Sequence, residues 1–225
     1  MGFFPVCLQL AGRHCLVIGG GEVAARKVEG LLACQAAVTV LSPQLSAELA
    51  RLHQQGELAW LARAYREGDL AGAFLVIAAT DDEAVQARIH AEAEAGNILL
   101  NVADVPKWCN VILPAVVRRG DLSVAISTGG ASPALARKLR RELEQRFGPE
   151  YDALLQLLAG LRCQVLAEGC DHRENRTRFH RLVEADLAGW IKDGRWDLVR
   201  EHVRATVGGA DALAWVETIR ERFSV

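Results

Sequence analysis

The sequence of 225 residues predicts an α/β protein in which a Rossmann-type parallel sheet precedes a small α+β region and an all-helical C-terminal region. Apolar strand patterns alternate with helical patterns up to about residue 113. Two short strand patterns separated by a turn follow Pro114, and every periodic segment after Pro149 is helical. These observations divide the chain into three expected regions, 1–113, 114–148 and 149–225.

The first region contains alternating strands and helices. Residues 15–18 predict a strand, and residues 22–34 predict a helix with its apolar side chains on one face. The run 74–79 is continuously apolar, as in a strand covered on both faces. Further strands are expected at 37–41, 58–61 and 98–100, and further helices around 44–54 and at 82–95, the last with Asp81 or Asp82 as N-cap and Gly96 at its end. This order predicts a doubly wound parallel sheet.

A glycine-rich turn directly follows the first strand. It has the form G-x-G-x-x-A and consists of Gly19, Gly20, Gly21, Glu22, Val23 and Ala24. The first and third glycines allow a tight turn and let backbone N–H groups approach a pyrophosphate, while the small alanine lets the helix pack close to its strand. The helix N-terminus favours anionic phosphates. With a strand before it and a helix after it, this segment predicts a dinucleotide-binding site.

The second and third regions have different patterns. Strands are expected at 115–119 and 122–126, joined by a turn at Arg119-Gly120-Asp121. Ser132 and Pro133 predict the N-cap and first residue of a basic helix that ends near Phe147. Further helices are expected at about 149–168, 172–187, 196–206 and 211–222, with breaks at Gly169, Asp193-Gly194 and Gly208-Gly209. Because a two-stranded sheet leaves its edges uncovered in a monomer, the region 114–148 predicts a homodimer.

Charge and hydropathy argue against several classes of partner. Basic and acidic residues number 26 and 28, so no global field favours nucleic acid or an anionic membrane. No apolar run approaches the ~20 residues of a membrane span, and the N-terminus lacks the parts of a signal peptide. The cysteines form no C-x-x-C pair and the histidines no H-x-x-x-H pair, which predicts reduced thiols and no metal site. We therefore expect a cytoplasmic protein without nucleic-acid or membrane partners.

The ends of the predicted strands supply further candidate residues, because ligands of open parallel sheets bind beyond the carboxyl ends of the strands. Ser42 and Pro43 follow the second strand, which ends without the acidic residue that usually holds the ribose of NAD and without an arginine for the 2′-phosphate of NADP. Thr80 and Asp81 lie where a nicotinamide ribose would pass. For Asp81 and Asp82, capping of the next helix is an equally good interpretation.

Asp104 follows the last strand of this region, after Asn101 and Val102, in a loop stiffened by Pro106. A carboxylate at the mouth of a crevice accepts a proton or stabilises a cation. On spacing alone, an ordinary loop aspartate is the better interpretation of Asp104.

A loop of small residues follows the hairpin and consists of Ser127, Thr128, Gly129 and Gly130. It is either a simple turn or an anion-binding loop that exposes backbone N–H groups. The helix after it carries Arg137, Lys138, Arg140 and Arg141, and Arg118 and Arg119 precede it. These side chains form either a solvated basic face or a site for a carboxylate-rich substrate.

Several segments together resemble the precorrin-2 dehydrogenase family, which includes the N-terminal part of siroheme synthase and the bifunctional dehydrogenase/ferrochelatase of yeast. The glycine turn alone is common to many folds, but the ordered set is specific. The matching segments are Phe4-Pro5-Val6 with Leu8, residues 17–24 with Arg26-Lys27, residues 78–82, residues 101–104 and residues 127–133. The resemblance covers about residues 1–150 strongly and the helical tail weakly.

The resemblance implies the NAD-dependent oxidation of precorrin-2 to sirohydrochlorin by a homodimer. It implies an NAD-binding Rossmann domain, a central dimerisation and substrate-loop region and a helical C-terminal region. The key aspartate of the family falls on Asp104, and its loop near the tetrapyrrole falls on Ser127 and Thr128, where Thr128 replaces a serine of some members. Arg137 and the small-residue loop are then expected to hold substrate carboxylates.

Three alternatives remain open at this point. Some members of the family also insert iron, although the segment 105–110 looks closer to members with dehydrogenase activity alone. An NAD-binding regulatory module, as in potassium transport systems, usually has an acidic residue at the end of its second strand, where this chain has Leu41-Ser42-Pro43. A tetrapyrrole carrier with a vestigial dinucleotide site is disfavoured by the intact glycine turn.

Overall fold

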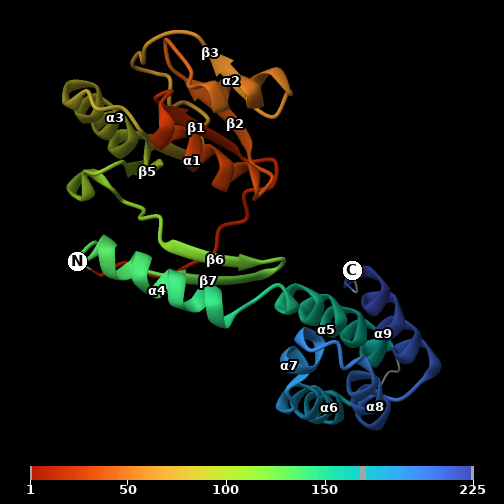
Figure 1. Cartoon of the computed structure of the whole chain (residues 1–225). Helices are drawn as coiled ribbons and strands as arrows, with labels where there is room; N and C mark the ends of the chain where they lie inside the picture. Colours follow the sequence, from red (N-terminus) through yellow and green to blue (C-terminus); the bar gives the residue numbers. More distant parts are fainter. Residues whose placement is uncertain (1, 168–170, 224–225) are drawn as a thin grey trace. The chain divides into compact units, whose positions relative to one another are not determined.

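The computed structural model describes residues 2–167 and 171–223, and the chain divides into two compact units between Leu113 and Pro114. The first unit is built on a five-stranded parallel sheet (Figure 1). Its strands lie in the order β3-β2-β1-β4-β5, so the direction of winding reverses between β1 and β4. Ligands of such sheets bind at this switch point, beyond the carboxyl ends of the strands. The strands are β1 (His14–Ile18), β2 (Ala37–Leu41), β3 (Ala59–Leu61), β4 (Leu75–Ala78) and β5 (Leu99–Val102).

The register brings the carboxyl ends of the central strands to one level. Ile18 of β1 pairs with Leu41 of β2 and with Ala78 of β4, and Ala78 pairs with Val102 of β5. The loops that follow these four strands therefore begin side by side along one edge of the sheet.

Both faces of the sheet are covered by helices, which are α1 (Glu22–Leu32), α2 (Ala47–Gln54) and α3 (Glu83–Gly96). Alternate residues of β1 enter different cores, as the two-residue period of a strand requires. Val17 packs in one cluster with Val28 of α1, and Leu16 packs in the other with Ile89 of α3. The continuous apolar pattern of the strands follows from this double coverage.

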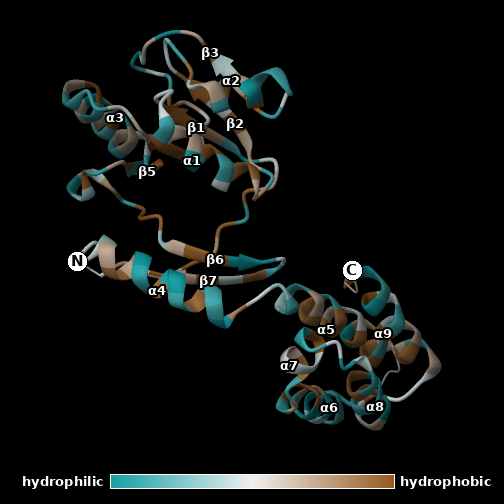
Figure 2. Cartoon of the chain, viewed as in Figure 1, coloured by the Kyte–Doolittle hydropathy of each residue, from teal (hydrophilic) through white to brown (hydrophobic). Residues whose placement is uncertain are grey.

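The second unit begins with an antiparallel hairpin and a helix, β6 (Ala115–Arg119), β7 (Leu122–Ile126) and α4 (Pro133–Arg146). Ser132 caps α4 by accepting a hydrogen bond from the Leu135 N–H at 3.2 Å. Figure 2 shows hydrophilic residues along much of α4. Within these three elements, all of which the structure describes, only Val117 and Ala136 are buried.

The rest of the second unit is a helical bundle of α5 (Glu150–Ala167), α6 (His172–Glu184), α7 (Leu187–Lys192), α8 (Trp196–Thr206) and α9 (Ala210–Phe223) (Figure 1). Its core includes Leu157 and Leu161 of α5, Val199 of α8 and Val216 of α9. Three tryptophans pack against this core from its periphery, Trp190, Trp196 and Trp215. No helix in the described part of the chain is both long and apolar enough to cross a membrane.

Two of the differences between the expected and the observed helix ends have a clear local cause. α3 includes Gly96 as its last residue and is capped by Asn97, which adopts a left-handed φ of 50° that Asn tolerates after a helix. The helix expected at 172–187 ends at Glu184, and a separate, unexpected helix α7 begins at Leu187, where the side chain of Asp186 accepts from the Gly189 N–H at 3.0 Å. The break expected at Gly169 lies outside the described residues.

Candidate functional site

The glycine turn after β1 is locked against two neighbouring loops. Gly19 has a φ of 126°, and its N–H donates to the Leu41 carbonyl at 3.0 Å. A Cβ at position 19 would lie 2.3 Å from the Ala79 carbonyl oxygen, and a Cβ at position 20 would lie 1.9 Å from the Gln44 carbonyl oxygen. Both positions therefore require glycine for backbone packing alone.

Gly21 is different, because it faces open space. A Cβ at this position would meet no atom within 4 Å, and its φ of −88° is accessible to any residue. Gly21 is the N-cap of α1 and offers no side chain as a cap, whereas Ser46 and Asp82 cap α2 and α3. The first N–H groups of α1, from Glu22 through Val23 to Ala24, have no intrahelical partners. This uncapped helix end beside free space fits the pyrophosphate of a dinucleotide.

The loop after β2 is held against the glycine turn. Ser42 is buried, and its carbonyl accepts a hydrogen bond from Trp60 Nε1 at 2.9 Å. The Ser46 N–H donates to the Gly20 carbonyl at 2.7 Å, and Pro43 is exposed between these contacts. Residues 42–50 include no basic side chain, and Arg51 is paired with Glu48. Nothing in this loop offers a positive charge to a ribose 2′-phosphate.

The loop after β4 is fixed by the first turns of α3. The Asp82 side chain accepts from the Ala84 and Val85 N–H groups at 2.9 and 3.0 Å, so Asp82 and not Asp81 is the N-cap. Asp81 is exposed, and Thr80 is half-buried. Nε2 of the buried Gln86 donates to the Thr80 carbonyl at 2.6 Å, while its Oε1 has no partner among the described residues.

The end of β5 directs its side chains into the protein. The buried Asn101 donates from Nδ2 to the Val111 carbonyl at 3.0 Å, and the Val102 N–H donates to Sγ of Cys109 at 3.2 Å. The side-chain amide of Asn101 is therefore used inside the loop. At Asn101 and Val102, only backbone atoms remain for contact with a cofactor. The loop then continues into a short 3₁₀ helix, η1 (Pro106–Trp108).

Asp104 projects from this loop with its carboxylate exposed. Its φ of 59° is left-handed, a conformation that non-glycine residues adopt seldom and that Asp tolerates better than most. Lys27 of α1 belongs to the same neighbourhood. Burial and the charge of Arg26 lower the pKa of Lys27, while the negative charge of Asp104 opposes that shift. A half-buried ammonium group therefore lies within electrostatic range of the Asp104 carboxylate.

The small-residue loop of the second unit is closed by its own hydrogen bonds. Gly129 N–H donates to Ser127 Oγ at 3.1 Å, and Ser132 N–H donates to Thr128 Oγ1 at 3.1 Å. The Thr128 carbonyl accepts from the Ala131 N–H at 3.0 Å. The positive φ values of Gly129 and Gly130, 60° and 85°, make this tight turn possible. These N–H groups are used within the loop, which leaves the recognition of anions to nearby side chains.

The exposed face of α4 is basic and slightly hollowed. A surface hollow of about 460 Å³ lies elsewhere, on α6, and the hollow on α4 measures about 340 Å³. Arg137 and Arg141, one turn apart, both line the α4 hollow and form no ion pair with any described residue. Lys138 in the same hollow is 3.8 Å from Glu142. The two arginines are the cations of this face that remain available to carboxylates.

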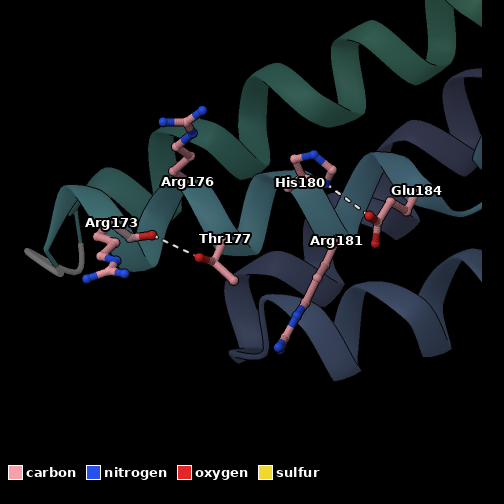
Figure 3. Close-up of a pocket in the computed structure, with 6 residues that line it drawn as sticks. All are labelled: Arg173, Arg176, Thr177, His180, Arg181 and Glu184. Carbon is pink, nitrogen blue, oxygen red and sulfur yellow. Dashed lines mark hydrogen bonds and ion pairs between the residues drawn. The ribbon is translucent and has the colours of Figure 1, made fainter.

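The larger hollow on α6 has a different character (Figure 3). It is lined from a single helix by Arg173, Arg176, Thr177, His180, Arg181 and Glu184. The side chains of Arg173, Arg176 and Arg181 point in different directions, and His180 is paired with Glu184 at 3.0 Å. Such divergent donors do not converge on one ligand.

Sequence reasoning assigned no site role to three residues that the structure brings to the edge of the sheet, Lys27, Gln86 and Cys109. In the sequence, Lys27 is a basic residue within an amphipathic helix pattern, and that pattern does not show that its side chain is half-buried. Gln86 and Cys109 act through backbone groups of neighbouring loops, for which no local pattern exists. Among the described residues, no three His, Cys, Asp or Glu side chains are grouped to hold a metal ion.

Two family models match the chain. Residues 6–115 match a family described as "Putative NAD(P)-binding", and residues 119–146 match the family "Sirohaem biosynthesis protein central". The first match contains the glycine turn and Asp104, and the second contains the small-residue loop and Arg137.

Curated relatives include several bacterial siroheme synthases. That of Thioalkalivibrio sulfidiphilus is 41% identical over 201 residues, which are 89% of this chain and 41% of the relative. That of Chromobacterium violaceum is 39% identical over 213 residues, 94% of this chain and 45% of the relative. That of Pseudomonas aeruginosa is 40% identical over 195 residues, 87% of this chain and 42% of the relative. The chain therefore spans less than half of the length of each of these relatives.

Among solved structures, the chain is similar to SirC, a precorrin-2 dehydrogenase. The two share 27% sequence identity with a TM-score of 0.71, and the match covers 97% of this chain and 100% of SirC.

Proposed function

The chain belongs to the family of precorrin-2 dehydrogenases and siroheme synthase N-terminal regions, and on this premise we propose that it oxidises precorrin-2 to sirohydrochlorin with NAD. The observation that carries the proposal is the edge of the sheet at β1, β4 and β5. There the open, uncapped end of α1 and the loop that presents Asp104 follow strands whose ends lie level.

The site residues divide by role. Gly19 and Gly20 shape the turn, while Gly21 and the N–H groups of Glu22, Val23 and Ala24 bind the pyrophosphate. The loops at Ser42-Pro43 and Thr80-Asp81 line the two ribose positions, and the backbone at Asn101 and Val102 borders the nicotinamide. NAD is proposed on the family resemblance, since residues 42–50 lack a cation for a 2′-phosphate and Leu41-Ser42-Pro43 also lacks the acidic residue that usually holds the ribose of NAD.

The oxidation removes a hydride and a proton from precorrin-2, and bound NAD supplies the acceptor for the hydride. Asp104 is placed to take the proton on a carboxylate oxygen. Its exposed carboxylate follows the end of β5, and the half-buried Lys27 of α1 lies within electrostatic range of it.

Substrate recognition is assigned to the region 114–148. Precorrin-2 carries several carboxylates, and Arg137 with Arg141 offers two cations one turn apart on α4. The guanidinium group binds carboxylates through two parallel hydrogen bonds. The closed loop of Ser127, Thr128, Gly129 and Gly130 at the start of this helix then shapes the approach of the substrate.

We also propose that this region forms a homodimer and that the protein acts in the cytoplasm. Apart from Val117 and Ala136, the hairpin and α4 bury no complete side chain, which leaves apolar surface for a second copy. The proposal of a cytoplasmic location rests on thiols that form no disulfide, among them Cys7, Cys15, Cys109 and Cys163.

The test is an anaerobic assay of the purified protein with precorrin-2. We expect one NADH to form for each sirohydrochlorin, with NAD preferred to NADP. Tight NAD binding without any change in the tetrapyrrole spectrum would contradict the proposal and support a regulatory module.

A further inference from the structure

One side chain closes the loop that carries Asp104. Sγ of Cys109 accepts a hydrogen bond from the Val102 N–H at 3.2 Å. The same thiol lies 3.3 Å from the Val102 carbonyl oxygen and 3.5 Å from that of Val105, so its proton is donated to one of them. Cys109 therefore joins the residues on both sides of Asp104.

The base of the loop is fixed separately, along the free edge of β5. The Leu100 N–H donates to Oδ1 of Asn110 at 2.6 Å, and Nδ2 of Asn110 donates to the Ile98 carbonyl at 2.8 Å. The Val111 N–H adds a bond to the Leu100 carbonyl at 3.2 Å. These contacts replace a neighbouring strand, because β5 ends the sheet. Between Ala103 and Cys109, the backbone bonds are those of the Ala103 N–H to the Ala78 carbonyl at 2.8 Å, of the Val105 N–H to the Val102 carbonyl at 3.4 Å, and of η1.

Within this segment, Asp104 holds a left-handed φ of 59°. A non-glycine residue persists in such a conformation only where its surroundings impose it. Burial raises the pKa of the Cys109 thiol, which therefore keeps its proton at neutral pH and both accepts and donates.

We propose that Cys109 is a positioning residue whose thiol holds the Asp104 loop in the conformation that proton transfer requires. The proposal rests on the proposed function, because the role of Asp104 is part of that function.

The test compares Cys109→Val, which keeps a similar apolar volume without a donor, with Cys109→Ser, which keeps a donor and an acceptor. Cys163→Ala is the control, because Cys163 is an exposed cysteine of α5. Turnover and KM are measured for each protein, together with the thermal midpoint and the hydrogen exchange of the amides at 102–105.

We expect Cys109→Val to lower kcat about tenfold or more, because small displacements of a reacting group are costly, while KM for NAD stays within about twofold. Its Val102 amide should exchange faster than in the parent. Cys109→Ser should recover most of the turnover and of the protection, and Cys163→Ala should match the parent. A role in packing alone would affect Ser at least as strongly as Val.

Parent-like kcat and parent-like protection in Cys109→Val would overturn the proposal. A parent protein without turnover would instead contradict the proposed function and the catalytic part of this inference. Hydrogen exchange then decides the structural part alone: unchanged protection in Cys109→Val refutes the tie between Cys109 and Val102, and faster exchange supports it.

Discussion

Gly19 lies so close to Ala79 that a Cβ on Gly19 would be 2.3 Å from the Ala79 carbonyl oxygen. This approach joins the turn after β1 to the loop after β4, on the two sides of the switch point. Two positions later, a Cβ on Gly21 would have no atom within 4 Å. The three glycines of the turn therefore serve two different purposes, the packing of the protein and the approach of a ligand.

This difference predicts opposite behaviour of two alanine variants. Gly21→Ala should leave the thermal midpoint unchanged, because its backbone and its surroundings accept a methyl group. Its affinity for NAD should fall at least about tenfold, because the methyl group occupies the space of the pyrophosphate. Gly19→Ala should instead lower the thermal midpoint before any ligand is added. Calorimetry with and without NAD measures both effects, and parent-like NAD affinity in Gly21→Ala would refute the assignment of the turn.

Asn101 provides a test of which atoms of β5 face the cofactor. Its amide is buried and donates to the Val111 carbonyl at 3.0 Å. Asn101→Ala should lower the free energy of unfolding by about 1–3 kcal/mol, because the partly buried carbonyl of Val111 loses its hydrogen-bond donor. Affinity for NAD should remain that of the parent in the folded fraction. A selective loss of NAD affinity without a loss of stability would show that the side chain itself contacts the cofactor.

Arg137 tests the recognition of substrate carboxylates. Arg137→Ala should raise KM for precorrin-2 by about tenfold, the value of one charge-assisted hydrogen-bonding group. KM for NAD should stay unchanged. Arg173→Ala is a matched control, since Arg173 is also an exposed arginine on a helix but lines a hollow with divergent side chains. If Arg137→Ala and Arg173→Ala raise KM for precorrin-2 equally, the effect comes from surface charge in general and α4 carries no specific site.

The ion pair of Arg63 and Asp69 predicts a dependence of stability on pH. Two hydrogen bonds of 2.7 Å join the groups, and the bond to Arg63 lowers the pKa of Asp69 below its ordinary value of 3.8. A carboxyl group whose pKa is lower in the folded state stabilises the protein above its unfolded pKa and loses this contribution as the pH falls. Asp69→Asn should therefore lower the thermal midpoint at about pH 7, and the difference from the parent should shrink toward about pH 3. A difference that is constant with pH would contradict this account.

The sheet and the glycine turn follow from the sequence because their signals are local. The strands around Val17 and Ile77 are short apolar runs bounded by turn residues, and the glycine spacing is contiguous with them. The expected helix end at Gly96 was displaced by one residue, since Asn97 is also able to adopt the left-handed conformation that ends a helix.

The contacts around Asp104 were not predictable in the same way. The sequence places Asp104 after a strand, but it does not show that the chain turns back so that Cys109 bonds Val102, or that Lys27 of another helix lies within electrostatic range of Asp104. The cap at Asp186 was missed for a related reason, because the apolar residues on either side continue a helical pattern through it. Side-chain bonds to the backbone decide both features, and their partners are set by the tertiary fold.

The most direct test of the central claim is the anaerobic turnover of precorrin-2 by Asp104→Asn beside the parent, with NAD affinity measured for both. Asparagine keeps the size of the side chain and the tolerance for a left-handed φ, but it does not accept the proton. We predict that kcat falls at least about a hundredfold while NAD affinity stays that of the parent. Parent-like kcat in Asp104→Asn would contradict the account and leave Asp104 an ordinary loop residue.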